Sequence, residues 1–157
     1  MPPPAILDPG ALDAAKIIAD RQAIEAYNHQ RFEFQLLDAV LLFDETTRVF
    51  AGYHDVRADA WWARGHIPGR PLFPGVLMIE VAAQLSSYAS NRALARTGFL
   101  GFVGVDGVKF RGAVEPPARF LVVGRATMLK PRRTVCVTQG FVGDAMVFEA
   151  EITGMPI

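Results

Sequence analysis

Between Arg70 and Arg92 the chain carries a single charged residue, Glu80. It lies in the run of residues 75–85, GVLMIEVAAQL, where apolar residues would occupy every side of a helix. A helix that is apolar all round has to be covered all round. We therefore predict a buried central helix from about Pro74 to Leu94, covered by a curved antiparallel sheet.

Most of the remaining sequence favours strands, because β-branched and aromatic residues recur in short runs separated by turn residues. In the last of these runs apolar and polar residues alternate, as in a half-buried strand. Strands are predicted at 34–43, 48–56, 108–110, 119–129, 134–142 and 145–153, with turns at 44–47 and 143–144 and a glycine-rich connection at 98–107. No alternating β/α pattern is present, so the predicted fold class is α+β, with five or six strands around one long helix.

The N-terminal part differs from this pattern. Apolar residues recur at helical spacing from Ala11 to about Tyr27, which predicts an amphipathic helix. Residues 1 to about 28 would then form an N-terminal extension and helix. Because 157 residues with 51% hydrophobic content suit one core, we predict a single domain over 1–157.

Composition excludes several classes of function. Sixteen basic residues balance sixteen acidic ones without a basic run, so the pattern of a nucleic-acid-binding protein is missing. No apolar stretch reaches the roughly 18 residues of a membrane span. The lone Cys136 cannot form an intrachain disulfide, and the first residues do not resemble a signal peptide, so a cytoplasmic location is expected.

A rigid loop precedes the central helix. The segment from Gly65 to Gly75 holds three prolines and three glycines, which exclude a regular helix or central strand. This loop places His66 shortly before the start of a helix, where the first N–H groups have no partner inside the helix. An imidazole, the carboxyl group of Glu80 in an apolar setting and a helix N-terminus together suit proton transfer beside an activated carbonyl group.

These residues also carry a resemblance. The segment 66–75, HIPGRPLFPG, followed by 80–84, EVAAQ, resembles the motif of 3-hydroxyacyl-[acyl-carrier-protein] dehydratases of the FabZ type, with the acid 14 residues after the histidine. Similarity extends over about three quarters of the chain, through residues 31–40, 109–111 and the last hairpin. The resemblance implies the hotdog fold, in which a curved sheet wraps around a long helix.

The resemblance also implies a site and partners. His66 would remove the C2 proton of a 3-hydroxyacyl thioester, and Glu80 would protonate the leaving 3-hydroxyl group. Substrate contacts would come from Gly75, Val76, Gln84, Ile67 and Phe73, with the Gly75 N–H on the thioester carbonyl and Gln84 orienting the acid. An acyl carrier protein would deliver the substrate to a homodimer or a trimer of dimers, and neither a metal nor another cofactor would be needed.

Alternatives remain at this point. A hotdog thioesterase would use a carboxylate to activate water, and a non-catalytic acyl-binding subunit would keep only the fold. Glu80 would lose its function as an acid if it paired with Arg64 or Arg70. The chain also departs from the family in having His29-Gln30 where Pro-His is usual and Ile67 where phenylalanine is usual. Trp61-Trp62 would either line an acyl tunnel or belong to the core or an interface.

Overall fold

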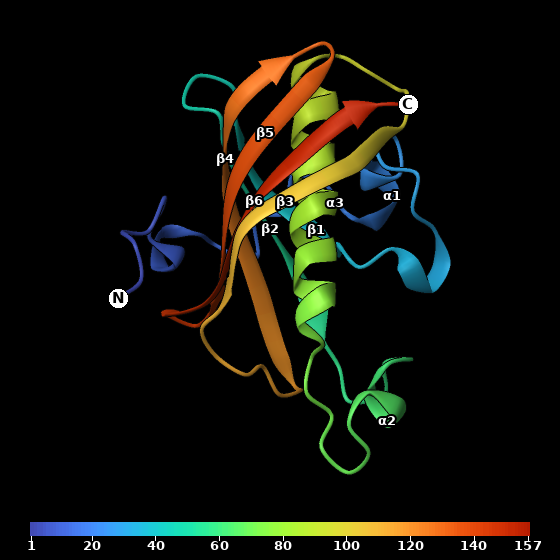
Figure 1. Ribbon diagram of the computed structural model, residues 1–157, viewed down its shortest axis with the longest axis vertical. Helices are drawn as coiled ribbons and strands as arrows, with labels where there is room; N and C mark the ends of the chain where they lie inside the picture. Colours follow the sequence, from blue (N-terminus) through green and yellow to red (C-terminus); the bar gives the residue numbers. More distant parts are fainter.

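The computed structural model describes all 157 residues and confirms the α+β prediction (Figure 1). Six antiparallel strands form one sheet in the order β1-β2-β4-β5-β6-β3. The strands are β1 (Ala39–Asp44), β2 (Val49–Val56), β3 (Leu100–Phe110), β4 (Ala118–Lys130), β5 (Arg133–Val142) and β6 (Ala145–Pro156). The helices are α1 (Arg21–Ile24), α2 (Ala63–His66) and α3 (Gly75–Ala93), with 3₁₀ turns at Pro9–Ala11 and Phe32–Phe34.

The long helix α3 runs along one face of the sheet, as the apolar run predicts (Figure 1). It begins after Pro74 and ends within one residue of the predicted boundary. Its buried side chains, such as Val81 and Leu85, pack against side chains that point inward from the strands. The strand residues include Phe50, Phe120, Phe148 and Ile152. None of the helices is long and apolar enough to cross a membrane.

The predicted helix from Ala11 to about Tyr27 is wrong, because only the single turn α1 forms there. Ile18 and Ala19 instead lie extended along β1, where the Ile18 N–H donates to the Val40 carbonyl (2.9 Å) and the Val40 N–H to the Ala19 carbonyl (2.9 Å). Asp20 then caps α1 by accepting a hydrogen bond from the Ala23 N–H at 2.8 Å. Backbone hydrogen bonds with the edge strand β1 therefore outweigh the helical preference that the sequence pattern indicates.

Two strand boundaries also differ from the prediction. Residues 35–38, after the 3₁₀ turn at Phe32–Phe34, form a loop ahead of β1, because the N–H groups of Leu36 and Leu37 donate to the side chain of Gln84 instead of a neighbouring strand. The glycine-rich stretch 98–107 is largely strand β3, which pairs with β6 through two irregularities. Gly107, with φ of 58°, lies at the second of them, where a positive φ suits glycine.

The first residues cover part of the opposite face of the sheet from α3 (Figure 1). The Ile6 N–H donates to Gln139 Oε1 (2.8 Å), and Gln139 Nε2 donates to the Pro4 carbonyl (2.9 Å). Ile6 and its neighbour Leu7 pack on a small apolar cluster that includes Phe141. Both faces of the sheet are therefore at least partly covered, and β3 remains the edge strand without a partner.

Candidate active site

Glu80 lies on the second turn of α3 in a largely buried position. Burial raises the pKa of its carboxyl group above the ordinary value, and a hydrogen bond from Gln84 Nε2 to Glu80 Oε1 (2.8 Å) opposes part of this rise. No arginine pairs with it, since Arg70 lies beside Glu115 at 3.3 Å. A carboxyl group with a raised pKa keeps its proton to a higher pH, as a general acid requires.

Gln84 connects this acid to the loop before β1. Besides its bond to Glu80, its Nε2 donates to the Phe34 carbonyl (2.8 Å), and its Oε1 accepts from the N–H groups of Leu36 (3.0 Å) and Leu37 (3.1 Å). The side chain is only 1% exposed, and both of its polar atoms are paired. Because these backbone contacts fix the amide orientation, the NH₂ group must point at Glu80.

The ring of His66 has one nitrogen held by the loop. The distance from Nδ1 to the Leu72 carbonyl oxygen is 2.7 Å. A carbonyl oxygen only accepts, so in the neutral ring Nδ1 carries the hydrogen and Nε2 keeps its lone pair. His66 ends the short helix α2 and is exposed, which leaves Nε2 available as a base.

The same side of the molecule holds the N-terminus of α3. His66 and Val76 line a cavity of about 390 Å³, together with Trp61, Trp62, Gly65, Pro74 and Leu77. The backbone N–H groups of Gly75 and Val76 donate to no protein acceptor. A side chain at Gly75 would meet the ring of Phe110, since a Cβ there would lie 2.8 Å from its Cε1. Free N–H groups at a helix start are suited to hold a carbonyl oxygen.

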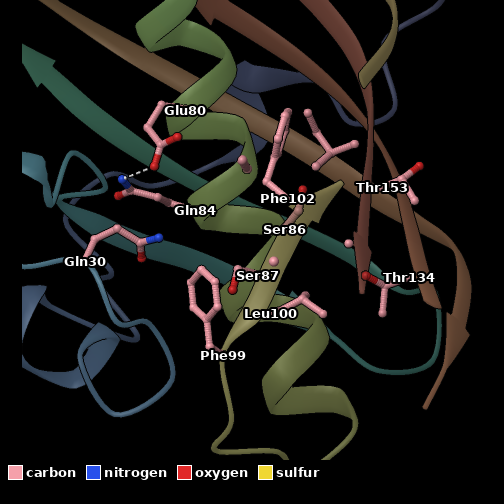
Figure 2. A pocket seen from close by; sticks show the side chains of 14 residues that line it. Gln30, Glu80, Gln84, Ser86, Ser87, Phe99, Leu100, Phe102, Thr134 and Thr153 are labelled. Atoms are coloured by element: carbon pink, nitrogen blue, oxygen red, sulfur yellow. Dashed lines mark hydrogen bonds between the residues drawn. The ribbon is translucent and has the colours of Figure 1, made fainter. Parts of the chain in front are cut away.

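Glu80 opens into a different cavity, of about 180 Å³, between α3 and the start of β3 (Figure 2). Gln84 and Gln30 lie beside it, and Phe99, Phe102 and Ser87 continue the wall. His66 does not line this cavity, and Glu80 does not line the cavity of His66. One copy of the chain therefore does not bring His66 and Glu80 into a common cavity.

The other predicted contacts fall in different surroundings. Phe73 is buried among aromatic rings, with its centroid 5.4 Å from that of Trp62 and 5.8 Å from that of Phe120. Ile67 is 39% exposed and borders neither cavity. Trp61 is half exposed, whereas Trp62 belongs to the core. Both border the cavity of His66, and an acyl tunnel there stays a prediction. Substrate contacts by Ile67 and Phe73 stay predictions.

Sequence reasoning missed most of the wall of the Glu80 cavity. Ala83 and Ser87 follow Glu80 by three and seven residues, a spacing that places them on the same side of a helix, and this signal was available. Gln30, Phe99 and Thr134 come from distant segments. No local pattern links those three residues, because only the packing of loops and strands against α3 brings them together.

Replacing Glu80 with glutamine is expected to stabilise the fold, increasingly with pH. The folded pKa lies above the ordinary value of 4.5, so ionisation favours the unfolded chain as the pH rises through the interval between the two values. Glutamine does not ionise and still accepts from Gln84. Urea unfolding should give a higher free energy of unfolding for Glu80→Gln at pH 8 and a nearly equal one near pH 4, whereas the exposed control Glu45→Gln should differ little at either pH. A lower free energy of unfolding for Glu80→Gln than for the wild type at pH 8 would contradict the raised pKa of Glu80.

Solved structures share this fold at low sequence identity. The dehydratase heterocomplex ApeI:P from Xenorhabdus doucetiae superimposes with a TM-score of 0.73 at 11% identity, covering 85% of this chain and 90% of that chain. A sigma28-regulated virulence protein from Campylobacter jejuni gives a TM-score of 0.68 at 11% identity over 94% of each chain. At such identities the likeness establishes the fold alone.

Sequence comparison is more specific. A family model described as a FabA-like domain matches residues 28–151. The 3-hydroxyacyl-[acyl-carrier-protein] dehydratase FabZ of Desulforamulus reducens is 34% identical over 136 residues, covering 85% of this chain and 94% of the relative. The protein of the same name from Moorella thermoacetica is 33% identical over 134 residues, covering 85% and 93%. The chain therefore belongs to the FabA-like domain family and, within it, to the FabZ-type 3-hydroxyacyl-[acyl-carrier-protein] dehydratases.

Proposed function

We propose that this protein eliminates water from a (3R)-3-hydroxyacyl thioester carried by acyl carrier protein and releases the trans-2-enoyl thioester. The observation that carries the proposal is the presence of two groups: the partly buried carboxyl group of Glu80, whose pKa is raised, and the imidazole of His66, whose Nε2 is free. The first group suits an acid and the second a base, which elimination requires at neighbouring carbons. The names of the FabZ relatives support the same substrate class.

In the proposed reaction, the N–H groups of Gly75 and Val76 hold the thioester carbonyl oxygen and stabilise the negative charge that develops on it. His66 Nε2 takes the proton from C2, and the electron pair forms the C2–C3 double bond. The C3–O bond breaks as Glu80 gives its proton to the departing hydroxyl group, which leaves as water. His66 then holds one proton more and Glu80 one fewer, so transfer of a proton between them resets the site.

We further propose that each site uses His66 of one copy and Glu80 of a second copy. In a single copy the two residues line separate cavities. The edge strand β3 exposes Phe102, Val103 and Phe110, each close to half of its maximum. An unpaired apolar edge is suited to pairing with another strand, and a two-fold pair along β3 would cover these side chains. Assembly into a trimer of dimers stays a prediction.

Acyl carrier protein is the proposed partner for the entrance beside His66. Arg64 and Arg70 are exposed on either side of His66 along the chain, where cations would attract an acidic carrier and its phosphate-bearing arm, although Arg70 also lies 3.3 Å from Glu115. Arg111 is less available, because its Nε pairs with Glu149 at 2.8 Å. The proposed compartment is the cytoplasm.

The test is mass spectrometry of the purified protein incubated with (3R)-hydroxyacyl thioesters of several chain lengths on acyl carrier protein. Dehydration removes the mass of one water from the intact thioester, which is the expected result. Free acid would instead identify a thioesterase, and unchanged thioester at every chain length would contradict catalysis. Coenzyme A thioesters run in parallel show whether the carrier protein is required.

A further inference from the structure

The orientation of His66 depends on one peptide unit of the loop before α3. The Leu72 carbonyl oxygen lies 2.7 Å from His66 Nδ1. The N–H of the same peptide unit belongs to Phe73 and donates to the Val114 carbonyl oxygen at 2.8 Å. In a trans peptide the C=O and N–H groups point in opposite directions, so fixing one fixes the other. Whatever holds Phe73 in place therefore also directs the Leu72 carbonyl group toward His66.

Three aromatic rings surround the side chain of Phe73, which is only 3% exposed. The rings of Trp62 and Phe120 lie 5.4 Å and 5.8 Å away and are inclined to it by 53° and 61°. The ring of His54 lies 5.2 Å away and is inclined by only 29°. His54 therefore stacks on Phe73, whereas the other two rings contact it at an angle. A stacked ring limits the tilt of Phe73 and, with it, movement of the peptide unit that precedes it.

His54 is itself held in one orientation. Its Nδ1 lies 2.6 Å from the Leu36 carbonyl oxygen and 3.1 Å from Asp38 Oδ2. Burial alone would raise the pKa of the Asp38 carboxyl group, but hydrogen bonds from His54, the backbone and Arg21 hold it below the ordinary value. Asp38 is therefore ionised, and since both neighbours of Nδ1 only accept, Nδ1 carries a hydrogen. The two contacts fix the plane of the ring.

A histidine at this position needs an explanation beyond packing. The residue is only 9% exposed, and a polar ring is costlier to bury than the phenyl ring that would fill the same space. What the imidazole adds is its directional contact with the loop ahead of β1. That loop also supports the acid, because the Leu36 N–H donates to Gln84 Oε1 (3.0 Å) and Gln84 donates to Glu80. The candidate base and acid of one chain thus rest on the same short segment.

We propose that His54 is a positioning residue for His66 and acts through Phe73. By limiting the tilt of Phe73, the His54 ring keeps the Leu72 carbonyl group on His66 Nδ1 and leaves Nε2 free to take the C2 proton. His54 lines neither the cavity of His66 nor that of Glu80. Under the proposed dehydratase function, on which this inference rests, it acts on the base and not on the substrate.

Variants without the ring test the contact. In His54→Leu, and in His54→Asn, whose amide can still donate to the Leu36 carbonyl, kcat is expected to fall about tenfold to a hundredfold, the scale of a small misplacement of a catalytic group. KM should stay within about threefold, because His54 lines neither cavity. Two variants of different polarity are used so that a folded one is available. A wild-type kcat in a folded variant of either kind would overturn the inference.

Tyr53→Leu is the matched control. Tyr53 precedes His54 on β2, is similarly buried at 6% exposure, and packs with Ala39 and Leu41 in a cluster separate from the one that contains Phe73. Loss of this ring removes a comparable amount of packing without touching Phe73. The control should therefore keep the wild-type kcat, and unfolding curves should show that each assayed variant is folded.

A double variant separates positioning from a general structural effect. If His54 acts through His66, adding His54→Leu to His66→Ala leaves the residual turnover unchanged, because the base is already absent. If His54 only supports the fold, the same factor is lost with and without His66. Equal losses in the two backgrounds would therefore overturn the inference.

Nuclear magnetic resonance of histidine labelled with ¹⁵N in the ring provides a test without turnover. At a pH where the ring is neutral, wild-type His66 is expected to show the Nδ1–H tautomer that the Leu72 carbonyl group selects. In the folded His54 variants part of the signal should move to the Nε2–H tautomer, and in Tyr53→Leu none should. An unchanged tautomer in the His54 variants would overturn the inference even if the wild type dehydrates its substrate. A wild type that dehydrates nothing would overturn the proposed function, while the tautomer comparison would still decide whether His54 orients His66.

Discussion

Turnover by His66→Ala and by Glu80→Gln is expected to fall at least about a hundredfold, the scale of losing a general base or a general acid. Alanine removes the imidazole that is proposed to accept the C2 proton. Glutamine keeps the size of Glu80 and its contact with Gln84 but has no acidic proton to give. The measurement is kcat for the conversion of a (3R)-hydroxyacyl thioester to the enoyl thioester under saturating substrate.

Two controls separate chemistry from folding. Glu45→Gln, an exposed change on the β1–β2 turn, should keep nearly full activity, and unfolding curves should show that the two inactive variants remain folded. Added imidazole is expected to restore part of the turnover of His66→Ala but not of Glu80→Gln. Activity near that of the wild type in both variants would end the mechanism proposed here.

Mixing the two inactive variants is expected to restore activity. In a dimer that contains one His66→Ala chain and one Glu80→Gln chain, one site would have lost both groups and the other would hold both intact. Random exchange of subunits makes half of the dimers mixed, so roughly a quarter of the wild-type activity should return. The measurement is turnover of an equimolar mixture after subunit exchange, compared with each variant alone.

The matched control is the double variant His66→Ala/Glu80→Gln mixed with wild type. In a mixed dimer of these two chains, neither shared site holds both His66 and Glu80. The activity of this mixture should therefore not exceed that of its dimers of two wild-type chains. If the single variants exchange subunits, as light scattering or a tagged chain can show, and the mixture stays inactive, then each site is built from one chain. That result would contradict the shared site while leaving the roles of His66 and Glu80 open to the single-variant test.

Local features of the sequence were sufficient to predict the central helix and the loop before it. The prolines and glycines between Gly65 and Gly75 restrict the backbone directly, and the apolar run that follows predicts a helix that has to be covered. The contact of Gln84 with Glu80 followed from a separation of four residues, which is one turn of helix. Each of these inferences depends on residues close together in the chain.

The N-terminal segment shows where local reasoning fails. Its helical periodicity from Ala11 to Tyr27 was real, but the backbone of Ile18 and Ala19 gains hydrogen bonds with β1 that no local pattern reveals. The glycine-rich stretch at 98–107 became strand for a similar reason, since pairing with β6 supplies the order that the glycines lack. In both segments a distant partner decided the structure.

The sequence by itself determined the buried helix and the rigid loop and named His66 and Glu80 as the candidate base and acid, because these inferences depend on residue type and short spacing. Only the tertiary structure decided that His66 and Glu80 open into separate cavities and that Gln30, Phe99 and Thr134 line the cavity of Glu80. It also decided the pKa of Glu80, which burial among several segments raises. Desolvation and the convergence of distant side chains arise from packing, which brings together residues that no local pattern connects.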